Sequence, residues 1–263
     1  MVTLLSSGVQ RLDSKTERSL MKSSFLETTL GKKLYKIKEK MVWEKELGRG
    51  ISPVDVTRFG ASAISDIRDH LHTLALVLSL SEPQNILELG TRGGESTRVI
   101  HNYCQRNSIS GRSIDLSMAP SWIQNSRNWI HYQGDDIEIG TRLRKQKTWP
   151  DGDAFRPLDF LFIDTSHEYL HTLEELRTYI PLVKQNGVVV FHDTNLSSKP
   201  HRRLDGTIGY GWDNARGVSR AIEEYFQVKL LDGIFYSAGE LENIADLFSY
   251  PWSNGFTIIK LPK

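Results

Sequence analysis

The apolar residues of this chain follow two different spacings. Within residues 61–80 they recur at steps of three and four, which predicts an amphipathic helix that Pro83 ends. After this helix, short apolar runs alternate with helical stretches. The runs that predict strands are 85–89, 112–116, 129–133, 158–163 and 187–191. Strands that alternate with helices indicate βαβ units, right-handed crossovers and a parallel sheet.

The C-terminal part of the chain predicts how the sheet ends. The glycine-rich segment 195–216 is expected to be a long loop, and a helix should follow at Gly217–Phe226. Two more apolar runs, at 228–236 and 255–261, predict a closing pair of strands. The expected fold is therefore Rossmann-like α/β, with a doubly wound, mostly parallel, seven-stranded sheet.

The N-terminal segment has a different pattern, which predicts a helical extension over 1–55 ahead of a main domain at 56–263. Leu34, Ile37 and Met41 recur at helical spacing, while three lysines follow a separate line along the helix. We interpret this as a solvated basic face above a packing stripe. A substrate lid, an arm that forms a homo-oligomer, and a contact with an anionic surface are the alternatives.

Composition adds the distribution of charge to this picture. The chain has 263 residues, 39% hydrophobic and 25% charged, which indicates a soluble globular protein and excludes disorder. Residues 1–50 hold 11 Lys and Arg against 6 Asp and Glu, a net +5, and the remainder holds 22 against 26, a net −4. Because the basic excess is confined to the first 50 residues, we expect no nucleic-acid partner.

The cysteine content and the lengths of the apolar runs bear on location. Cys104 is the single cysteine, so no intramolecular disulfide can form, and a reducing cytoplasm is expected. No apolar run approaches the roughly 20 residues that span a bilayer, and the first residues lack the apolar core of a signal peptide. We expect neither a transmembrane segment nor a targeting segment.

A glycine cluster follows the first predicted strand, at the sheet edge where open α/β sheets bind ligands. Gly90 and Gly94 would let the backbone turn sharply and approach a ligand closely. A dinucleotide fingerprint would need glycines at positions 92 and 95, which are Arg92 and Glu95. The loop therefore suits a nucleoside without phosphates, and a tight turn that binds nothing is the alternative.

Residues 88–96, Glu-Leu-Gly-Thr-Arg-Gly-Gly-Glu-Ser, resemble motif I of the class I S-adenosylmethionine-dependent methyltransferases. The resemblance implies that Gly90 and Gly94 flank the methionine and ribose parts of S-adenosylmethionine. It also places Ser96 beside the methionine carboxylate at a helix N-terminus, and it counts Glu88 among the cofactor-binding residues.

Two aspartates at later strand ends extend this prediction. Asp115 closes the second strand, where an acidic side chain can accept hydrogen bonds from ribose hydroxyls, although a surface turn would also explain it. Gly134-Asp135-Asp136 resembles the turn that contacts adenine in the family, with Asp135 opposite the exocyclic amine. A helix N-cap explains Asp135 or Asp136 equally well.

Carboxylates also end the next two strands. Asp164 follows an apolar run that predicts a strand buried on both faces, and His192-Asp193 ends the following strand. Two converging carboxylates repel, so a positive group must compensate them. A divalent cation, the cofactor sulfonium or an arginine would do so. Oxygen ligands suit Mg²⁺, whereas Zn²⁺ prefers more His or Cys.

Residues 158–194 resemble the methyltransferase family that contains macrocin-type sugar O-methyltransferases and cephalosporin-hydroxylase-like proteins. The resemblance covers about residues 85–195. It implies that Asp164 and Asp193 bind a metal, and His192 stands where sugar-type relatives carry a carboxylate ligand. His167 stands where some sugar-type relatives carry a histidine, which implies a general base. A histidine that only bonds a carbonyl is the alternative.

These features predict an O-methyltransferase with S-adenosylmethionine as cofactor, assisted by Mg²⁺ or another divalent cation. The expected acceptor is a small molecule, a sugar or glycosylated metabolite, recognised by the loop 195–216 through Arg202, Arg203, Tyr210 and Trp212. The alternatives are a non-catalytic S-adenosylmethionine-binding module, a phenolic or nitrogen acceptor, and an iron site made of two histidines and one carboxylate.

Overall fold

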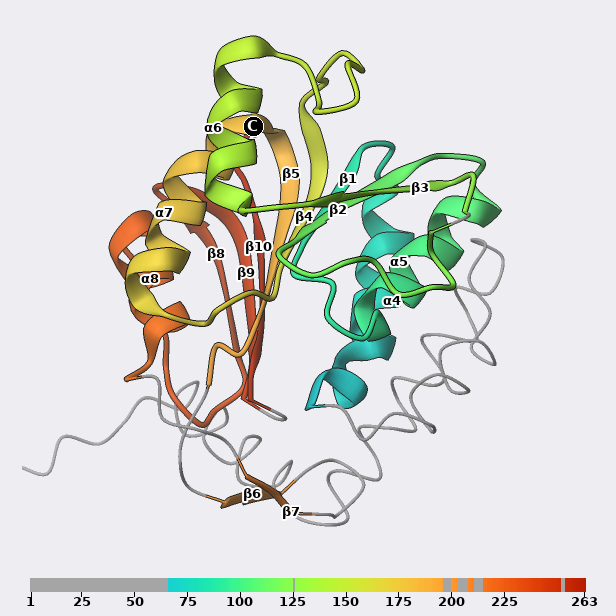
Figure 1. Ribbon diagram of the computed structural model, residues 1–263. Coiled ribbons are helices and arrows are strands. Elements are labelled where there is room, and N and C mark those ends of the chain that lie inside the picture. Colours follow the sequence, from blue (N-terminus) through green and yellow to red (C-terminus); the bar gives the residue numbers. More distant parts are fainter. Residues whose placement is uncertain (1–65, 125, 196–199, 203–207, 211–214, 252–253) are drawn as a thin grey trace, which may run out of the picture.

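The computed structural model describes residues 66–263 except 125, 196–199, 203–207, 211–214 and 252–253 (Figure 1). The predicted helical extension 1–55 and its boundary with the main domain lie outside the described residues. The same holds for Arg203 and Trp212 of the predicted acceptor loop. Among the described helices, none is both long and apolar enough to cross a membrane.

An eight-stranded sheet forms the centre of the described chain, in the order β3-β2-β1-β4-β5-β10-β9-β8 (Figure 1). The first five strands pair in parallel, and the last three run antiparallel to their neighbours. The strands are β1 Ile86–Leu89, β2 Gly111–Asp115, β3 Trp129–Gln133, β4 Leu158–Ile163, β5 Val183–His192, β8 Tyr236–Leu241, β9 Ile244–Tyr250 and β10 Phe256–Lys260. The predicted doubly wound, mostly parallel sheet is confirmed, with one strand more than expected.

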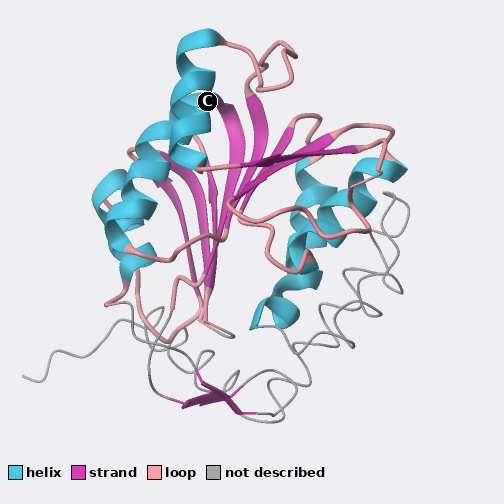
Figure 2. Ribbon diagram, in the orientation of Figure 1, coloured by secondary structure: helices cyan, strands magenta, loops and turns pink. Residues whose placement is uncertain are grey.

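Helices cover both faces of this sheet (Figure 2). One face carries the 3₁₀ turn η2 Asp66–His70 with α4 Leu71–Ser81 and α5 Glu95–Arg106. The other face carries α6 Asp136–Gln146, α7 Tyr169–Tyr179, the 3₁₀ turn η3 Ile180–Leu182 and α8 Gly217–Phe226. The helix predicted over 61–80 is therefore a 3₁₀ turn followed by an α-helix within its described part.

Strand β4, which is apolar at every position except Asp159, shows why a central strand can carry so few polar residues. Phe160 and Phe162 pack into the core beneath α4 and α5, whereas Leu161 and Ile163 pack into the core beneath α6, α7 and α8. Side chains alternate between the faces of a strand, so a strand covered on both faces is apolar at most of its positions. The prediction that this strand is buried on both faces is confirmed.

The C-terminal strands differ from the prediction. Residues 228–235 form no strand, because Asp232 and Gly233 lie in a turn and Gly233 has a φ of +73°. The hairpin of β8 and β9 follows instead, and its first strand, Tyr-Ser-Ala-Gly-Glu-Leu, is too polar to be recognised from apolar runs. The predicted loop 195–216 also contains a short antiparallel pair, β6 Pro200–Arg202 and β7 Ile208–Tyr210.

Candidate functional site

The carboxyl ends of β1, β2 and β4 meet at the glycine turn. Gly90 donates its N–H to the carbonyl of Ile114 at 2.9 Å, and Asp164 donates its N–H to the carbonyl of Leu89 at 2.9 Å. Gly90 has a φ of +84°, and a Cβ there would lie 2.0 Å from the Asp164 carbonyl oxygen. The predicted sharp turn is confirmed, and its close approach is to the end of β4.

Gly94 forms the second part of this turn, as the N-cap of α5. Its φ is +83°, and a Cβ would lie 2.8 Å from the ring of Trp122. Trp122 comes from the loop after β2, which the sequence analysis did not assign to the site. The indole Nε1 of Trp122 is buried, and no hydrogen-bond partner for it exists among the described residues.

The side chain of Asp115 links the end of β2 to the glycine turn through hydrogen bonds. Its carboxylate accepts hydrogen bonds from the N–H groups of Thr91 at 2.6 Å, Arg92 at 2.9 Å and Ser117 at 2.7 Å. Burial raises the pKa of Asp115, but these hydrogen bonds outweigh it and lower the pKa below the usual value. The site therefore holds an ionised carboxylate where the sequence predicts a ribose-binding acid.

Glu88 and Ser96 lie deeper than the sequence suggested. The Glu88 carboxyl is fully buried and accepts hydrogen bonds from Ser96 Oγ at 2.6 Å and Thr97 Oγ1 at 2.7 Å. Burial raises the pKa of Glu88 to about 8. Both side chains thus join β1 to the first turn of α5, and the Ser96 hydroxyl points to Glu88. Their contact with a cofactor stays a prediction.

Asp135 is the N-cap of α6. Its backbone is extended, and its side chain accepts a hydrogen bond from the N–H of Glu138 at 2.9 Å. This is one of the two roles that the sequence allowed. The adenine contact implied by the family resemblance stays a prediction.

Four side chains converge at the ends of β4 and β5: Asp164, His167, His192 and Asp193, which we call the site cluster. His167 Nε2 lies 3.0 Å from Asp164 Oδ1 and 2.8 Å from Asp193 Oδ2. His192 Nδ1 lies 3.2 Å and 3.3 Å from the same two oxygens. The structure therefore brings the predicted base and the three predicted metal ligands to one point.

Two residues of the site cluster have a left-handed backbone. The φ of His167 is +60° and that of Asp193 is +57°. Non-glycine residues adopt this region at a cost of order 1–3 kcal/mol each, and such residues concentrate at functional sites. Ordinary strand or helix geometry at these positions would aim the two side chains elsewhere.

The charges of the site cluster are strongly coupled. Burial lowers the pKa of His167, but hydrogen bonds with Asp164 and Asp193 outweigh it and raise the pKa to about 9. Burial also opposes the charge of His192, yet the same two carboxylates hold its pKa well above the usual value. Two imidazolium groups therefore supply the positive charge that the sequence analysis required near the carboxylates.

The site cluster fits a divalent cation. Asp164, His167 and Asp193 offer ligand atoms that all lie within 4.8 Å of one another. Neighbouring ligands of an octahedral ion are about 2.9 Å apart for metal–ligand distances of 2.0–2.1 Å, close to the spacings around His167 Nε2. Asp193 Oδ1 and His192 Nε2 are buried and have no hydrogen-bond partner among the described residues. Asp193 thus keeps an oxygen free for a cation.

Two further residues lie near the site cluster. Thr194 follows Asp193, turns into the sheet and accepts a hydrogen bond from Thr257 Oγ1 at 2.9 Å. His70 of η2 lies against His192, with ring centroids 5.8 Å apart. Because η2 precedes β1 by many residues, no local pattern indicates this contact.

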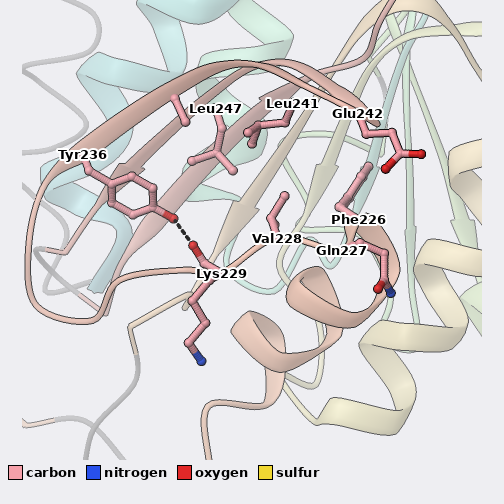
Figure 3. Close-up of a pocket in the computed structure, with 9 residues that line it drawn as sticks. Phe226, Gln227, Val228, Lys229, Tyr236, Leu241, Glu242 and Leu247 are labelled. Atoms are coloured by element: carbon pink, nitrogen blue, oxygen red, sulfur yellow. Dashed lines mark hydrogen bonds between the residues drawn. The ribbon is translucent and has the colours of Figure 1, made fainter.

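A separate hollow of about 340 Å³ lies between the C-terminal end of α8 and the β8–β9 hairpin (Figure 3). Phe226, Val228 and Leu247 contribute apolar side chains to its lining, and Lys229 and Glu242 contribute charged ones. The N-terminal end of α8 is the end that approaches the site cluster, since a Cβ on Gly217 would lie 2.4 Å from the His167 carbonyl oxygen. No residue predicted to be functional lines this hollow.

A family profile described as a methyltransferase domain matches residues 87–194. MycE methyltransferase from the mycinamycin biosynthetic pathway, solved with Mg and SAH, is similar at a TM-score of 0.51 and 16% identity, over 81% of this chain and 56% of MycE. An O-methyltransferase from Bacillus cereus, in complex with SAH, has a TM-score of 0.49 and 15% identity, over 85% of this chain and 90% of its own. TomG from Streptomyces achromogenes, an O-methyltransferase solved with SAM, has a TM-score of 0.49 and 17% identity, over 81% of this chain and 92% of TomG.

No curated protein matches the chain. This chain spans about half the length of MycE. The matched segment 87–194 runs from β1 to the residue after Asp193, so it contains the glycine turn, Asp115 and the whole site cluster. Residues 87–194 are therefore similar to a methyltransferase domain, and the likeness to MycE shows a shared fold.

Proposed function

We propose that this protein is an O-methyltransferase that moves the methyl group of S-adenosylmethionine to a hydroxyl of a small acceptor, a sugar or a glycosylated metabolite. The site cluster carries the proposal, because it lies at the sheet edge that also holds the glycine turn and Asp115. The fold shared with MycE, solved with Mg and SAH, supports the cofactor and the cation. The macrocin-type resemblance of residues 158–194 supports the sugar acceptor.

The nucleoside half of the cofactor suits the loop after β2. The Asp115 carboxylate would accept hydrogen bonds from the ribose hydroxyls. Leu116 and Met118 follow it with exposures of 73% and 68%, so this loop offers apolar surface close to Asp115. An adenine ring would cover this apolar surface, and the glycine turn would leave space for the methionine part.

A divalent cation such as Mg²⁺ would be held by Asp164 and Asp193, with His192 or His167 as the nitrogen ligand. When bound, such a cation lowers the pKa of an acceptor hydroxyl and fixes its position. The protein's main contribution would be alignment, with the acceptor oxygen about 3 Å from the methyl carbon and in line with the bond that breaks.

His167 would take the proton from the acceptor hydroxyl. Asp164 and Asp193 hold the imidazole in its protonated form, with a pKa of about 9. Once the charge of these carboxylates is neutralised, the pKa of His167 should fall toward the ordinary value of about 6.5. The neutral Nε2 can then act as general base, a contribution of about 10²- to 10⁴-fold in rate.

Equilibrium dialysis with labelled S-adenosylmethionine measures cofactor binding to the full chain. We expect binding in the micromolar range, and its absence would refute the proposal. Turnover is then measured with a panel of glycosides, nucleotide sugars and phenols, with and without chelator. Turnover that chelator leaves unchanged would remove the cation from the mechanism but keep the enzyme. Binding without turnover of any acceptor would indicate a non-catalytic module.

His167→Ala tests the assignment of the base. We expect the rate of methyl transfer at saturating acceptor to fall by about 10²- to 10⁴-fold, with Mg²⁺ affinity unchanged. An unchanged rate would contradict the role of His167. If Mg²⁺ affinity fell instead, His167 would be the nitrogen ligand of the cation. His192→Asn, measured in the same way, provides the reciprocal comparison.

A further inference from the structure

A second group of ionisable side chains lies outside the site cluster, between α6 and α7. Asp136 is the first residue of α6, and His171 and Glu175 lie four residues apart on one face of α7. These helices lie side by side on the same face of the sheet (Figure 1). We call Asp136, His171 and Glu175 the interhelix triad.

The ligand atoms of the interhelix triad converge. His171 Nε2 lies 3.3 Å from Asp136 Oδ1 and 3.7 Å from Glu175 Oε1, and the three atoms all lie within 4.8 Å of one another. A tetrahedral ion with ligand distances of 2.0–2.2 Å places its ligands about 3.3–3.6 Å apart. The distances around His171, 3.3 Å and 3.7 Å, are close to this geometry and longer than the 2.8–3.0 Å distances around His167.

Burial gives an independent reason to expect a ligand. Glu175 is fully buried and Asp136 is 8% exposed. Thr165 Oγ1 donates to Glu175 Oε1 at 2.7 Å, but Glu175 Oε2 and Asp136 Oδ2 are buried without a hydrogen-bond donor among the described residues. Carboxylate oxygens buried in this way need either a shared proton or a bound cation. The two carboxyl groups are close enough to share a proton, and an ion would serve both of them and His171 together.

We propose that the interhelix triad binds a divalent transition-metal ion of the Zn²⁺ class, at a site separate from the site cluster. One imidazole and two carboxylates form the same kind of donor set as Asp164, His167 and Asp193, so the wider spacing around His171, and not the donor types, favours a tetrahedral ion of the Zn²⁺ class here. His171 is partly exposed, with 30% of its side chain accessible, so an ion can reach the triad from solvent. A fourth ligand would come from water.

This ion would connect parts of the proposed cofactor crevice. Asp136 follows Asp135, which caps α6, and Thr165 follows Asp164, which belongs to the site cluster. Binding would thus tie the start of α6 to α7 and to the end of β4. The role is one of positioning, because no atom of the triad belongs to the site cluster.

Metal content of the full chain tests the proposal. The protein is stripped with chelator, dialysed against micromolar Zn²⁺ and analysed for zinc. We expect His171→Ala to lose one equivalent that the wild type holds, and Asp193→Asn, which impairs the site cluster, to keep that equivalent. Glu175→Gln should lose it too, whereas Glu174→Gln, an exposed neighbour on α7, should keep it. Circular dichroism verifies that each variant is folded.

Several outcomes separate the two sites. A wild type that binds a single ion lost in His171→Ala would support the interhelix triad even without a metal in the site cluster. Zinc content that is the same in wild type and folded His171→Ala would overturn the proposal, as would zinc lost entirely in Asp193→Asn. Co²⁺ provides a second measurement, since Asp193→Asn should show the visible absorption of four-coordinate Co²⁺. A wild type that binds no zinc at the interhelix triad would also overturn the proposal, and Asp136 and Glu175 would then share a proton instead.

Discussion

At the scale of single residues, the site depends on backbone conformations that few side chains tolerate. Gly90 and Gly94 occupy the left-handed region in the glycine turn, and His167 and Asp193 occupy it in the site cluster. Gly90 carries a second restriction, because the end of β4 leaves no room for a Cβ. The glycine pattern in the sequence predicts the turn, but the packing against Asp164 is a tertiary contact.

Gly90→Ala separates these two restrictions when it is compared with Gly152→Ala. Gly152 also has a left-handed φ, of +92°, but a Cβ there would meet nothing within 4 Å. We expect Gly152→Ala to lower the free energy of unfolding by about 1 kcal/mol. Gly90→Ala should cost about 3 kcal/mol or more, because the added Cβ would lie only 2.0 Å from the Asp164 carbonyl oxygen and this clash must also be relieved. Urea unfolding measures both, and equal losses would contradict the steric part.

At the scale of elements, the helices begin at residues that also border the crevice. Asp135 both caps α6 and follows β3 at the ligand edge, so its two predicted roles are compatible. Glu88 likewise joins β1 to the first turn of α5 through Ser96 and Thr97. Element ends in this fold therefore combine structural hydrogen bonds with proximity to the cofactor crevice.

Substitutions at Asp135 distinguish capping from cofactor binding. Asp135→Ala removes the acceptor for the Glu138 N–H and should lower the free energy of unfolding by about 1 kcal/mol. Asp135→Ser retains a capping oxygen and should restore most of this loss. If Asp135 also contacts adenine, both variants should bind S-adenosylmethionine more weakly than the wild type. Full affinity in Asp135→Ser would assign Asp135 to capping alone.

At the scale of the whole molecule, two apolar cores pack on opposite faces of one sheet, and ionisable groups are buried beside them. Glu88 is the clearest case, because its carboxyl is fully buried beneath α5 and its pKa is raised to about 8. An unfolded glutamate has a pKa of about 4.3. Between these values the folded chain keeps a proton that the unfolded chain has lost.

Global stability should therefore fall as the pH rises from about 4.5 to about 8. In this range the folded state binds more protons at Glu88, so each pH unit costs up to about 1.4 kcal/mol. Glu88→Gln cannot ionise, and its free energy of unfolding should depend less on pH than that of the wild type. Urea unfolding from pH 5 to 8 measures the difference, with the exposed Glu82→Gln as control. Parallel pH profiles for wild type and Glu88→Gln would contradict the assignment.

Much of the fold follows from local sequence patterns. The strands β3 and β4 and the helix α8 lie where the apolar spacing places them. The run that predicts β4 is the longest of these, because a strand covered on both faces is apolar at nearly every position. The edge strand β8 was missed because only one of its sides pairs with another strand, and half-exposed edges tolerate polar residues. The strand predicted at 228–236 was wrong over 228–235, because apolar residues also pack against the core from loops.

Residue spacing along the chain predicts the parallel sheet, the glycine turn and the position of Asp164, His192 and Asp193 at one edge, because the carboxyl ends of parallel strands meet there. The tertiary structure adds the contacts between individual atoms. His167 Nε2 lies between the two carboxylates, and the hydroxyls of Thr194 and Ser96 point into the fold. Asp136 at the start of α6 contacts His171 on the neighbouring helix α7. These contacts depend on backbone angles and on packing between distant segments, which residue spacing along one strand or helix does not encode.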